Sequence, residues 1–280
     1  MKKIIPVFVL AFILLSACNL PIGQPTADAD EVAARVAATL AAADPTSTET
    51  LPAEAIPTIG LETATLTATA TETVTPTATS SPDDPKLSLG NPDFWFNAAT
   101  SGDPFGVATN PYSDNAITIS NQPSGLNFVS KAINLGKRWR LSAFNPTNFY
   151  LEGTFKTGSC AGKDNYGLAM RVPTYNDSIG YFVGMSCDGS YIVDRLENEG
   201  YGVNLISWTQ DSHIKSGENQ VNRLGVQVIN DTFKIYINGS LVKEFSDNVI
   251  QNKGHVGAYV SARERSNFNV DLQELMAWVQ

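Results

Sequence analysis

The sequence predicts an all-β fold, an antiparallel β-sandwich of two sheets that follows a disordered tether. Three observations support this prediction. From about residue 87 onward, apolar and polar residues alternate with a period of two in at least nine segments, as they do in strands with one buried face. Asp-Gly and Asn-Gly pairs, which favour tight hairpins, separate some of these segments. No long helix is expected among them, so the strands should pack against one another as two layers.

The clearest strand is expected at residues 149–156. Phe149, Leu151 and Phe155 alternate there with more polar residues, which predicts one face toward the core and one toward solvent. The same alternation predicts further strands at residues 166–172, 181–187, 191–196, 224–229, 233–237, 241–245 and 256–260, and a closing strand at 270–279.

Two hairpin turns are well specified. Asp188-Gly189 separates the strands expected at 181–187 and 191–196, and Asn238-Gly239 separates those at 233–237 and 241–245. Asn and Gly adopt the positive φ angles that a two-residue hairpin loop requires. These two pairs of strands should therefore be direct antiparallel neighbours.

The N-terminus carries the features of a lipoprotein signal peptide. Two lysines precede an apolar run at residues 4–15, and Leu15-Ser16-Ala17-Cys18 follows. The small Ser16 and Ala17 would let a peptidase cleave before Cys18, whose thiol is then the lipid acceptor. The apolar run is shorter than the roughly 20 residues that span a bilayer. We therefore expect residues 1–18 to direct export, and lipidated Cys18 to anchor the chain at the extracytoplasmic face of the cell membrane.

Residues 19–86 are expected to form a disordered linker. They contain no aromatic residue and are rich in Ala, Thr, Pro and acidic residues, so they cannot bury enough apolar surface to offset the entropy of ordering. Threonine occupies every odd position from Thr63 to Thr79, but the small residues between them and Pro76 argue against a strand. Residues 28–43 are good helix formers and are the place for a short helix. The folded domain is expected at 87–280.

The distribution of charge excludes one class of partner. The net charge is −9 at pH 7, and residues 19–85 hold ten acidic residues against a single base, Arg35. From residue 86 to the end there are sixteen bases and eighteen acids. No basic field is therefore available to neutralise phosphates, and nucleic acid is not an expected partner.

Cys160 and Cys187 remain as an even pair once Cys18 is assigned to the lipid. In an oxidising exterior such a pair is expected to form a disulfide. If the strands near 149–157, 166–172 and 179–187 were consecutive in one meander, the first and third would end at the same edge and bring the two cysteines together. Two separate free thiols are the alternative. A zinc site is not expected, because the chain has no Cys-x-x-Cys and only two histidines, His213 and His255.

Several motifs of the C-terminal half resemble one family. Asn222-Arg223-Leu224-Gly225-Val226, the stretch from Phe233 to Gly239, and Gly254-His255-Val256-Gly257 are similar to the concanavalin A-like lectin/glucanase superfamily, and in particular to its laminin-G-like and keto-disaccharide-hydrolase-like members on bacterial surfaces. Asn165-Tyr166-Gly167-Leu168 and Asp188-Gly189-Ser190-Tyr191 extend the resemblance over residues 90 to 280. It implies a jelly roll of two curved antiparallel sheets.

The resemblance makes carbohydrate the leading ligand class, because many relatives bind or cut glycans on the concave sheet. A sugar site needs an exposed aromatic ring beside planar polar groups. Arg171 alternates with an apolar set and should face away from the core. Ordinary packing is the alternative for each of the candidates, which are Arg171, Tyr175, Asp177, Tyr181, Arg195, Tyr201 and Trp208.

Metal and catalytic signals are weaker. Several jelly rolls hold calcium, but the loop oxygens do not have the spacing of a dedicated cage, so a structural calcium ion is an alternative only and no metal ligand is assigned. The loop residues weighed for it are Asp164, Asn165, Asp177, Asp188, Asp231 and Asp247.

Retaining glucanases of the superfamily place two glutamates on one strand about 5 Å apart, and that pattern is missing. Glu197-Asn198-Glu199 is followed by Gly200 and Gly202, which indicates a loop, and Asp271 and Glu274 would face opposite sides of a regular strand. No Ser-His-Asp signature is present. The sequence therefore favours a non-catalytic carbohydrate-binding domain. A glycoside-processing enzyme, or a structural or protein-adhesion domain, is the alternative.

Overall fold

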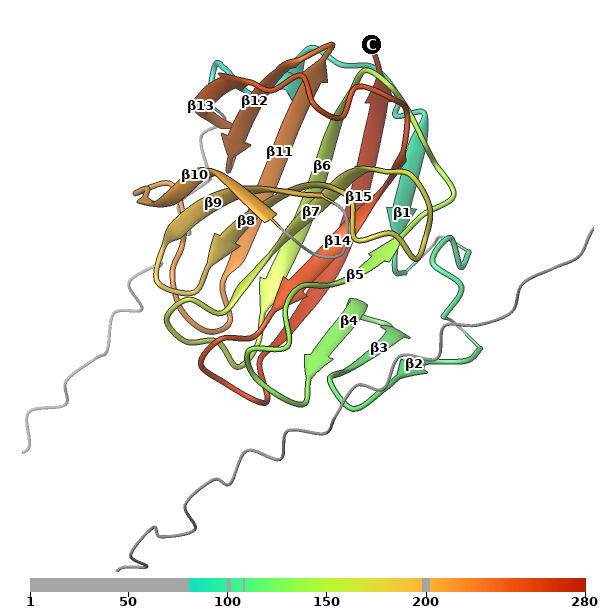
Figure 1. Cartoon of the computed structure of the whole chain (residues 1–280), viewed down its shortest axis with the longest axis vertical. Helices are drawn as coiled ribbons and strands as arrows, with labels where there is room; N and C mark the ends of the chain where they lie inside the picture. The colour runs from blue at the N-terminus through green and yellow to red at the C-terminus, as the bar shows by residue number, and fades with distance from the viewer. Residues whose placement is uncertain (1–80, 100–101, 108, 198–201) are drawn as a thin grey trace, which may run out of the picture. The chain divides into compact units, whose positions relative to one another are not determined.

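The computed structural model describes residues 81–99, 102–107, 109–197 and 202–280, all of them within one unit that spans residues 73–280. This part is an all-β sandwich of two antiparallel sheets, which confirms the expected fold class (Figure 1). The signal peptide with Cys18, the helix expected at 28–43, the linker up to residue 80 and Tyr201 lie outside the described residues. Within the described ranges, no helix has the length and apolarity needed to cross a bilayer.

One sheet has nine strands in the order β13-β12-β11-β6-β15-β4-β3-β2, and β1 pairs with β15 beside this path. Its strands are β1 (Phe94–Asn97), β2 (Tyr112–Ser113), β3 (Ile117–Gln122), β4 (Gly125–Ser130), β6 (Phe149–Thr157), β11 (Val221–Ile229), β12 (Thr232–Ile237), β13 (Ser240–Ser246) and β15 (Asn269–Val279).

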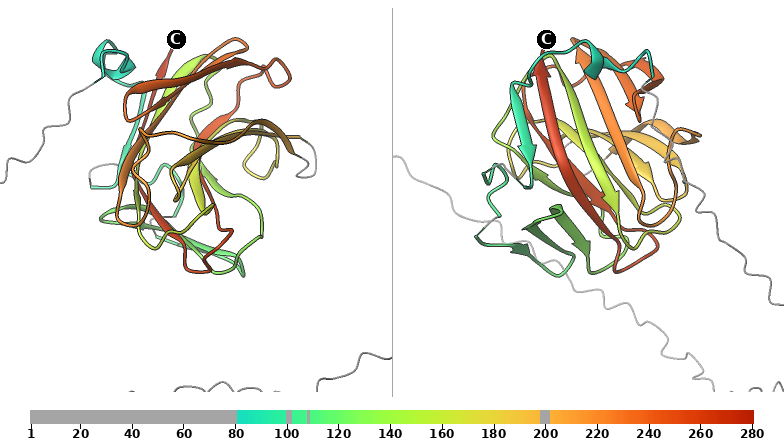
Figure 2. Two further views of the ribbon diagram at one scale, coloured as in Figure 1. Left: turned by 90° about the vertical axis from the view of Figure 1, so that its left-hand side faces the viewer. Right: turned by 180° about the vertical axis from the view of Figure 1, so that it is seen from behind.

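The second sheet has six strands in the order β10-β9-β8-β7-β14-β5 and lies in front of the first in Figure 1. Its strands are β5 (Arg138–Leu141), β7 (Asn165–Val172), β8 (Gly180–Ser186), β9 (Ser190–Leu196), β10 (Gly202–Gln210) and β14 (His255–Ser261). Figure 2 shows the two sheets as separate layers. Apart from the strands, the structure assigns one short 3-10 helix, η1 (Pro85–Leu87), within the described part.

The predicted strands and turns are present. Each of the nine alternating segments coincides with a strand, and both turn pairs join neighbours: β8 to β9 at Asp188-Gly189, and β12 to β13 at Asn238-Gly239. The φ angles of Asn238, Gly239 and Gly189 are 51°, 88° and 86°. The residue types that favour positive φ therefore lie where the tight turns need it.

The core lies between the sheets and is built by the alternation. Side chains such as Phe155 on β6, Leu168 on β7 and Val226 on β11 are buried in one cluster, while their sequence neighbours face outward. Burying a side chain of this kind contributes roughly 1.5–3 kcal/mol, so the period of two is the main source of the fold's stability.

Six strands were not expected from the sequence. β2 has two residues, and β1 and β5 have four each, too few for an alternation to be recognised. β10 occupies a segment that follows the predicted loop, and its pairing with β9 shifts register between Asn204 and Ile206 and again between Ile206 and Thr209. Bulges of this kind break the period of two.

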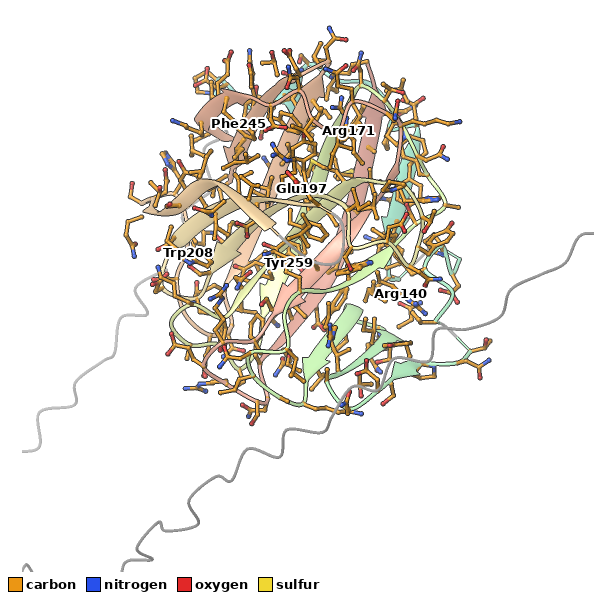
Figure 3. The ribbon with its side chains drawn as sticks, viewed as in Figure 1. Arg140, Arg171, Glu197, Trp208, Phe245 and Tyr259 are labelled. Carbon is orange, nitrogen blue, oxygen red and sulfur yellow. A yellow bond between two sulfur atoms is a disulfide. The ribbon has the colours of Figure 1, made fainter. Side chains whose placement is uncertain are left out.

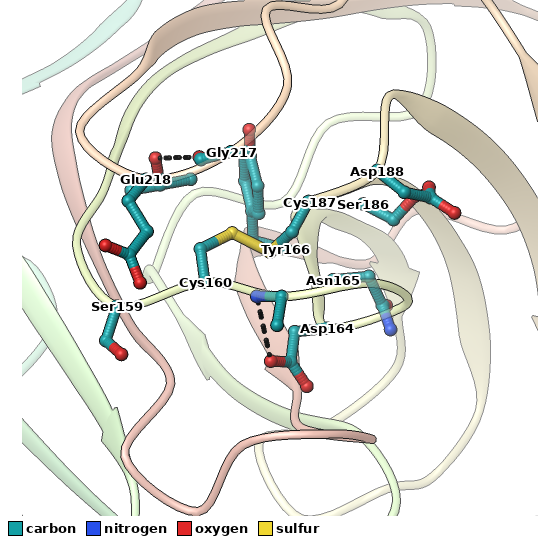
Figure 4. Close-up of a disulfide and its surroundings, with 12 residues drawn as sticks. Ser159, Cys160, Asp164, Asn165, Tyr166, Ser186, Cys187, Asp188, Gly217 and Glu218 are labelled. Atoms are coloured by element: carbon teal, nitrogen blue, oxygen red, sulfur yellow. Dashed lines mark hydrogen bonds between the residues drawn. A yellow bond between two sulfur atoms is a disulfide. The ribbon is translucent and has the colours of Figure 1, made fainter. Parts of the chain in front are cut away.

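The structure joins Cys160 to Cys187 by a disulfide, with a Cα–Cα distance of 5.6 Å (Figure 4). The pairing was expected, but the meander invoked for it is wrong. β6 belongs to the nine-stranded sheet, whereas β7 and β8 are neighbours in the six-stranded sheet. Cys160 lies in the connection that crosses between sheets. The bond closes a segment whose ends are 27 residues apart, which stabilises the fold by roughly 3–4 kcal/mol in the chain-entropy model.

The packed domain begins before the expected boundary at residue 87. Asp84 is 5% exposed and accepts a hydrogen bond from the Arg223 guanidinium of β11. Nζ of Lys86, within η1, lies 3.4 Å from the buried Glu152 carboxylate of β6. The segment that leads into β1 therefore packs on the outer face of the nine-stranded sheet.

Candidate functional site

Two adjoining hollows flank β5, the edge strand of the six-stranded sheet. One has a volume of about 380 Å³ and the other about 370 Å³, each within the range of small-ligand sites. Trp139, Arg140 and Tyr175 line both. The first hollow is also lined by Tyr112, Asp114, Ile117, Ile119, Lys137, Arg138 and Asn176, and the second by Asp103, Pro104, Phe105, Gly106 and Leu141. We call the two hollows together the β5 groove.

The groove follows from the position and pattern of β5. This strand pairs with β14 on one side and ends the order of its sheet on the other, so its second side is open. Trp139 and Leu141 pack outward against Phe182 and Tyr259. By the alternation of a strand, Arg138 and Arg140 point to the opposite side. In Figure 3, Arg140 lies at this edge of the sheet, far from Trp208 at the other edge.

The aromatic surface of the groove has a fixed orientation. Tyr175 lies in the β7–β8 connection and is 52% exposed, yet its ring stacks on His255 with centroids 4.3 Å apart. His255 is in turn held by a contact of 2.9 Å between its Nδ1 and the Ser142 carbonyl oxygen. Trp139 packs against Phe182 with ring centroids 5.7 Å apart. An exposed ring that is already ordered loses little entropy when a ligand stacks on it.

The polar groups of the first hollow are also oriented. The Arg140 guanidinium lies over the Tyr112 ring, 5.2 Å from its centroid. Asp114 Oδ1 accepts hydrogen bonds of 2.8 Å from the backbone N–H groups of Ala116 and Ile117, and its Oδ2 accepts one of 3.0 Å from Tyr112 Oη. Burial raises the pKa of Asp114, but the backbone hydrogen bonds, together with the Tyr112 hydrogen bond and the charge of Arg138, outweigh it and hold the pKa below its ordinary value. The hydrogen bond to Asp114 raises the pKa of Tyr112. Asp114 is therefore a carboxylate and Tyr112 a phenol at neutral pH.

The centre of the outer face of the six-stranded sheet is covered rather than open. Phe182 and Tyr259 are fully buried there. Lys137 Nζ lies 6.0 Å and 5.6 Å from the centroids of their rings and 2.7 Å from the Asp194 carboxylate. The lysine therefore closes over the two aromatic rings, and the accessible hollow is displaced to the β5 edge.

Arg171 is not a surface residue, and its prediction as a ligand-binding residue is corrected. Its side chain is fully buried, and its guanidinium donates hydrogen bonds of 2.7 to 3.0 Å to three backbone carbonyls, those of Thr147, Asn230 and Ile250. The expected alternation fails because Arg171 has a φ of 53° and the β7–β14 pairing shifts register there. The side chain turns inward and lies over the Phe233 ring.

Tyr181 and Arg195 belong to a buried polar cluster. Tyr181 is fully buried and its hydroxyl donates to Asp247, while the Arg195 guanidinium pairs with Asp247 and with Glu197. Burial raises the pKa of Tyr181 to about 12. These groups bind one another, so the prediction that Tyr181 and Arg195 contact a ligand is also corrected.

The other predicted residues are separated from one another. Asp177 is partly exposed in the same connection as Tyr175, and its backbone N–H closes a turn to Thr174. Trp208 lies on β10 at the opposite edge, where Lys163 Nζ is 4.8 Å from its ring centroid. Tyr201 lies outside the described residues. Of the candidates that the structure describes, Tyr175 is the one that lines the β5 groove.

Sequence reasoning missed the residues of β5 and of the β2–β3 hairpin. A signal was present: Lys137-Arg138-Trp139-Arg140 interleaves cations with an aromatic residue. Such a run is typical of a surface that meets a polar ligand, but its four-residue strand was too short to be recognised.

Most of the carboxylates weighed for calcium have internal partners. Asp164 Oδ1 accepts hydrogen bonds from the backbone N–H groups of Arg263, Glu264 and Arg265, and Asp188 is paired with Lys163 at 2.7 Å. Across the described ranges, no group of three or more His, Cys, Asp or Glu side chains is arranged to hold a metal ion.

Asp271 and Glu274 do not face opposite sides of β15. The strand has a register shift between Leu272 and Glu274, and Leu272 and Leu275 are both in the core. The bulge therefore places both acids on the outer face of the nine-stranded sheet. Asp271 accepts a hydrogen bond of 2.6 Å from Asn127 Nδ2, and Glu274 accepts one of 3.0 Å from the Trp95 indole.

No family model matches the chain, and no curated protein matches it in sequence. Solved structures do resemble it. A Bacillus subtilis protein of unknown function with a galectin-like fold aligns with a TM-score of 0.51 and 10% identity, over 67% of this chain and 96% of that one. The carbohydrate-binding module CBM66 of Bacillus subtilis gives 0.48 and 19%, over 57% and 91%. A Bacillus licheniformis β-glucanase gives 0.48 and 10%, over 68% and 99%. The galectin-like structure supports the jelly-roll β-sandwich that the strand order of the two sheets already indicates.

Proposed function

We propose that this chain is a lipid-anchored, extracytoplasmic protein whose jelly-roll domain binds carbohydrate in the β5 groove without cleaving it. One observation carries the proposal. Tyr175 is half-exposed, with its ring held against His255, in a groove that also contains Trp139 and Arg140. A pyranose offers an apolar face for stacking and a rim of hydroxyls for hydrogen bonds, and this groove provides partners for both.

The position of the groove at an edge suits a chain-like ligand. Its two hollows adjoin across Trp139, Arg140 and Tyr175, and both are open along the side of β5 that has no neighbouring strand. A glycan of several units could occupy both hollows and pass Tyr175 between them. We therefore infer an oligosaccharide rather than a monosaccharide as the ligand.

The membrane anchor is proposed from the sequence. The apolar run at 4–15 and Leu15-Ser16-Ala17-Cys18 support lipidation of Cys18, and the Cys160–Cys187 disulfide is what an oxidising compartment allows. A Cys18→Ser variant should leave the membrane fraction and lose incorporation of an alkyne-labelled fatty acid. Unchanged labelling of that variant would contradict the assignment of Cys18.

The environment of Asp114, the acid of the first hollow, favours binding over hydrolysis. A glycosidase needs a carboxyl group whose pKa is raised so that it can protonate the leaving oxygen. Asp114 has the opposite environment, because two backbone N–H groups and a phenol donate to its oxygens. It is suited to accept a hydrogen bond from a sugar hydroxyl.

The purified full chain, in detergent micelles, should retain oligosaccharides on a glycan array and release no reducing sugar from them. Tyr175→Ala should abolish retention, whereas Trp208→Ala, a matched aromatic change at the opposite edge, should preserve it. Equal losses in the two variants would refute the β5 groove as the site. Release of reducing ends would overturn the non-catalytic assignment in favour of a glycoside-processing enzyme.

A further inference from the structure

We propose that the β5 groove selects acidic glycans, and that Arg138 and Arg140 bind the carboxylate groups of their uronic acid units. This inference rests on the proposed carbohydrate-binding function and narrows its ligand class. The observation that supports it is that neither arginine forms an ion pair within the described part of the chain.

Arg138 lies close enough to Asp114 to help lower the pKa of that carboxyl, but neither Arg138 nor Arg140 is directly paired with a carboxylate within the described part of the chain. Neither guanidinium forms an ion pair there, and the one hydrogen bond in which either acts as donor is a long contact of 3.4 Å from Arg138 Nη1 to the Lys137 carbonyl. Both Nε atoms are buried without a hydrogen-bond partner. A buried Nε without an acceptor is unfavourable, and the partly exposed guanidinium groups can still donate hydrogen bonds to a ligand.

Among the other buried or partly buried arginines of the described residues, Arg171 and Arg223 also have an unpaired Nε atom, but another guanidinium nitrogen of each has an acceptor. Arg171 donates to three backbone carbonyls, Arg195 pairs with Asp247 and Glu197, and Arg223 pairs with Asp84. The fold therefore supplies acceptors for its structural arginines. The two on β5 are exceptions, and both line the first hollow of the groove.

Arg138 and Arg140 also have the geometry to act together. They are two residues apart on one strand, so their side chains emerge on the same side about 7 Å apart. The Tyr112 ring beneath the Arg140 guanidinium restricts its orientation. A planar guanidinium can donate two parallel hydrogen bonds to a carboxylate, which a hydroxyl cannot match.

The neighbouring charges leave this side of the groove positive. Asp114 is the acid of the first hollow, and hydrogen bonds from Ala116, Ile117 and Tyr112 already engage both of its oxygens. Lys137 is paired with Asp194 on the other face. In the first hollow two guanidinium groups therefore face a single carboxylate, while Arg140 also lines the second hollow with Asp103. The cations of the two hollows outnumber their acids, so an added anion lowers the electrostatic free energy.

Matched pairs of oligosaccharides test the proposal directly. The full chain in detergent micelles is titrated calorimetrically with oligomers of galacturonate, glucuronate and mannuronate, and with the neutral galactose, glucose and mannose oligomers of the same linkage and length. Within at least one pair, the acidic member should bind about tenfold or more tightly at low salt. This ratio should shrink as added salt screens the charges.

Substitutions identify the residues responsible. Arg138→Gln and Arg140→Gln should each reduce the preference for the acidic member by about fivefold or more, because the loss of affinity falls more heavily on the acidic member than on its neutral counterpart. Arg140→Lys keeps the charge and should recover part of the preference. Arg265→Gln, which removes an exposed arginine paired with Glu218, is the matched control and should leave it unchanged. Near-ultraviolet circular dichroism of each variant verifies that the fold is retained.

The outcomes separate this inference from the proposed function. Equal affinity for acidic and neutral members of every pair that binds would overturn the acidic selectivity and leave carbohydrate binding standing. A preference that survives in both glutamine variants would overturn the assignment of Arg138 and Arg140. Binding of none of the oligomers, together with no retention on the glycan array, would overturn the proposed function itself.

Discussion

At each edge of the six-stranded sheet a cationic side chain lies over an aromatic ring, but within the described ranges only the cation at the β10 edge is also paired with a carboxylate. At the β10 edge, Lys163 lies over Trp208, and at the β5 edge, Arg140 lies over Tyr112, with separations of 4.8 Å and 5.2 Å. The lysine also pairs with Asp188 at 2.7 Å, whereas neither Arg138 nor Arg140 forms a direct ion pair with a carboxylate among the described residues. A cation beside an aromatic ring is therefore free for a ligand only where the fold has not already neutralised it.

The largest effect on stability should come from removing the disulfide next to the β10 edge. The disulfide holds Cys187 just before Asp188, in the turn that leads to β9. Replacing both Cys160 and Cys187 by Ala should lower the free energy of unfolding by roughly 3 kcal/mol, measured by urea denaturation. The glycan affinity of the folded fraction should be unchanged, because the groove lies at the other edge. A parallel loss of affinity would show that the two edges are coupled.

The next largest effect should come from the aromatic surface of the groove. Tyr175→Ala removes the exposed ring beside Trp139 and should weaken oligosaccharide binding by about tenfold or more, since an aromatic stack contributes about 1 kcal/mol beyond the area it buries. Stability should change by less than about 0.5 kcal/mol, because Tyr175 is a loop residue with half of its surface exposed. Calorimetric titration and thermal melting measure the two quantities. Unaltered affinity would place the ligand elsewhere.

A smaller effect is expected for acid sensitivity at the β10 edge. Burial raises the pKa of Asp188, but hydrogen bonds from Lys163, Ser186 and Ser190 outweigh it, so the folded-state pKa lies below its ordinary value. A lowered folded-state pKa stabilises the fold fully above the unfolded value and loses this contribution as the pH falls through the folded value. Lys163→Met should remove part of the contribution, less than about 1 kcal/mol at neutral pH because both groups are partly exposed. Urea unfolding at pH 7 and pH 3 tests this: the variant should differ from the native chain at pH 7 more than at pH 3.

The smallest effect on the free energy of unfolding should come from removing a positive charge at the β5 edge. Arg140→Gln removes a charge that has no internal acceptor and should change the free energy of unfolding by no more than about 0.5 kcal/mol in either direction. Arg223→Gln is the informative contrast, because it breaks the pairing with the buried Asp84 and should destabilise the fold by about 2 kcal/mol. Comparable losses in the two variants would show that Arg140 has a structural role.

Long alternating strands made the fold predictable from sequence. Phe149, Leu151 and Phe155 mark β6 because each faces the core in a regular pleat. The site depends on features that leave no such pattern. β5 has only four residues, and Arg171 was misplaced because a bulge reverses the direction of its side chain.

Tyr175 was among the predicted residues because an aromatic residue in a polar loop is conspicuous, and it lines the β5 groove. Trp139 was missed because its neighbours in space, Phe182 and Tyr259, are far from it in sequence. The disulfide was predicted from the count of cysteines, while the sheet that holds each of its flanking strands was not. Composition can therefore indicate which two cysteines form a disulfide, but it does not indicate the order of strands that brings them together.

The contact between Asp84 and Arg223 determines where a mechanical load would enter the domain. Asp84 and Lys86 bind Arg223 and Glu152, which belong to β11 and β6, two interior strands of the nine-stranded sheet. Tension applied along the chain from residue 81 would therefore be carried by hydrogen-bonded strands in the middle of that layer. The β5 groove belongs to the edge of the other layer, so tension on the linker would bypass the surface that we propose as the binding site.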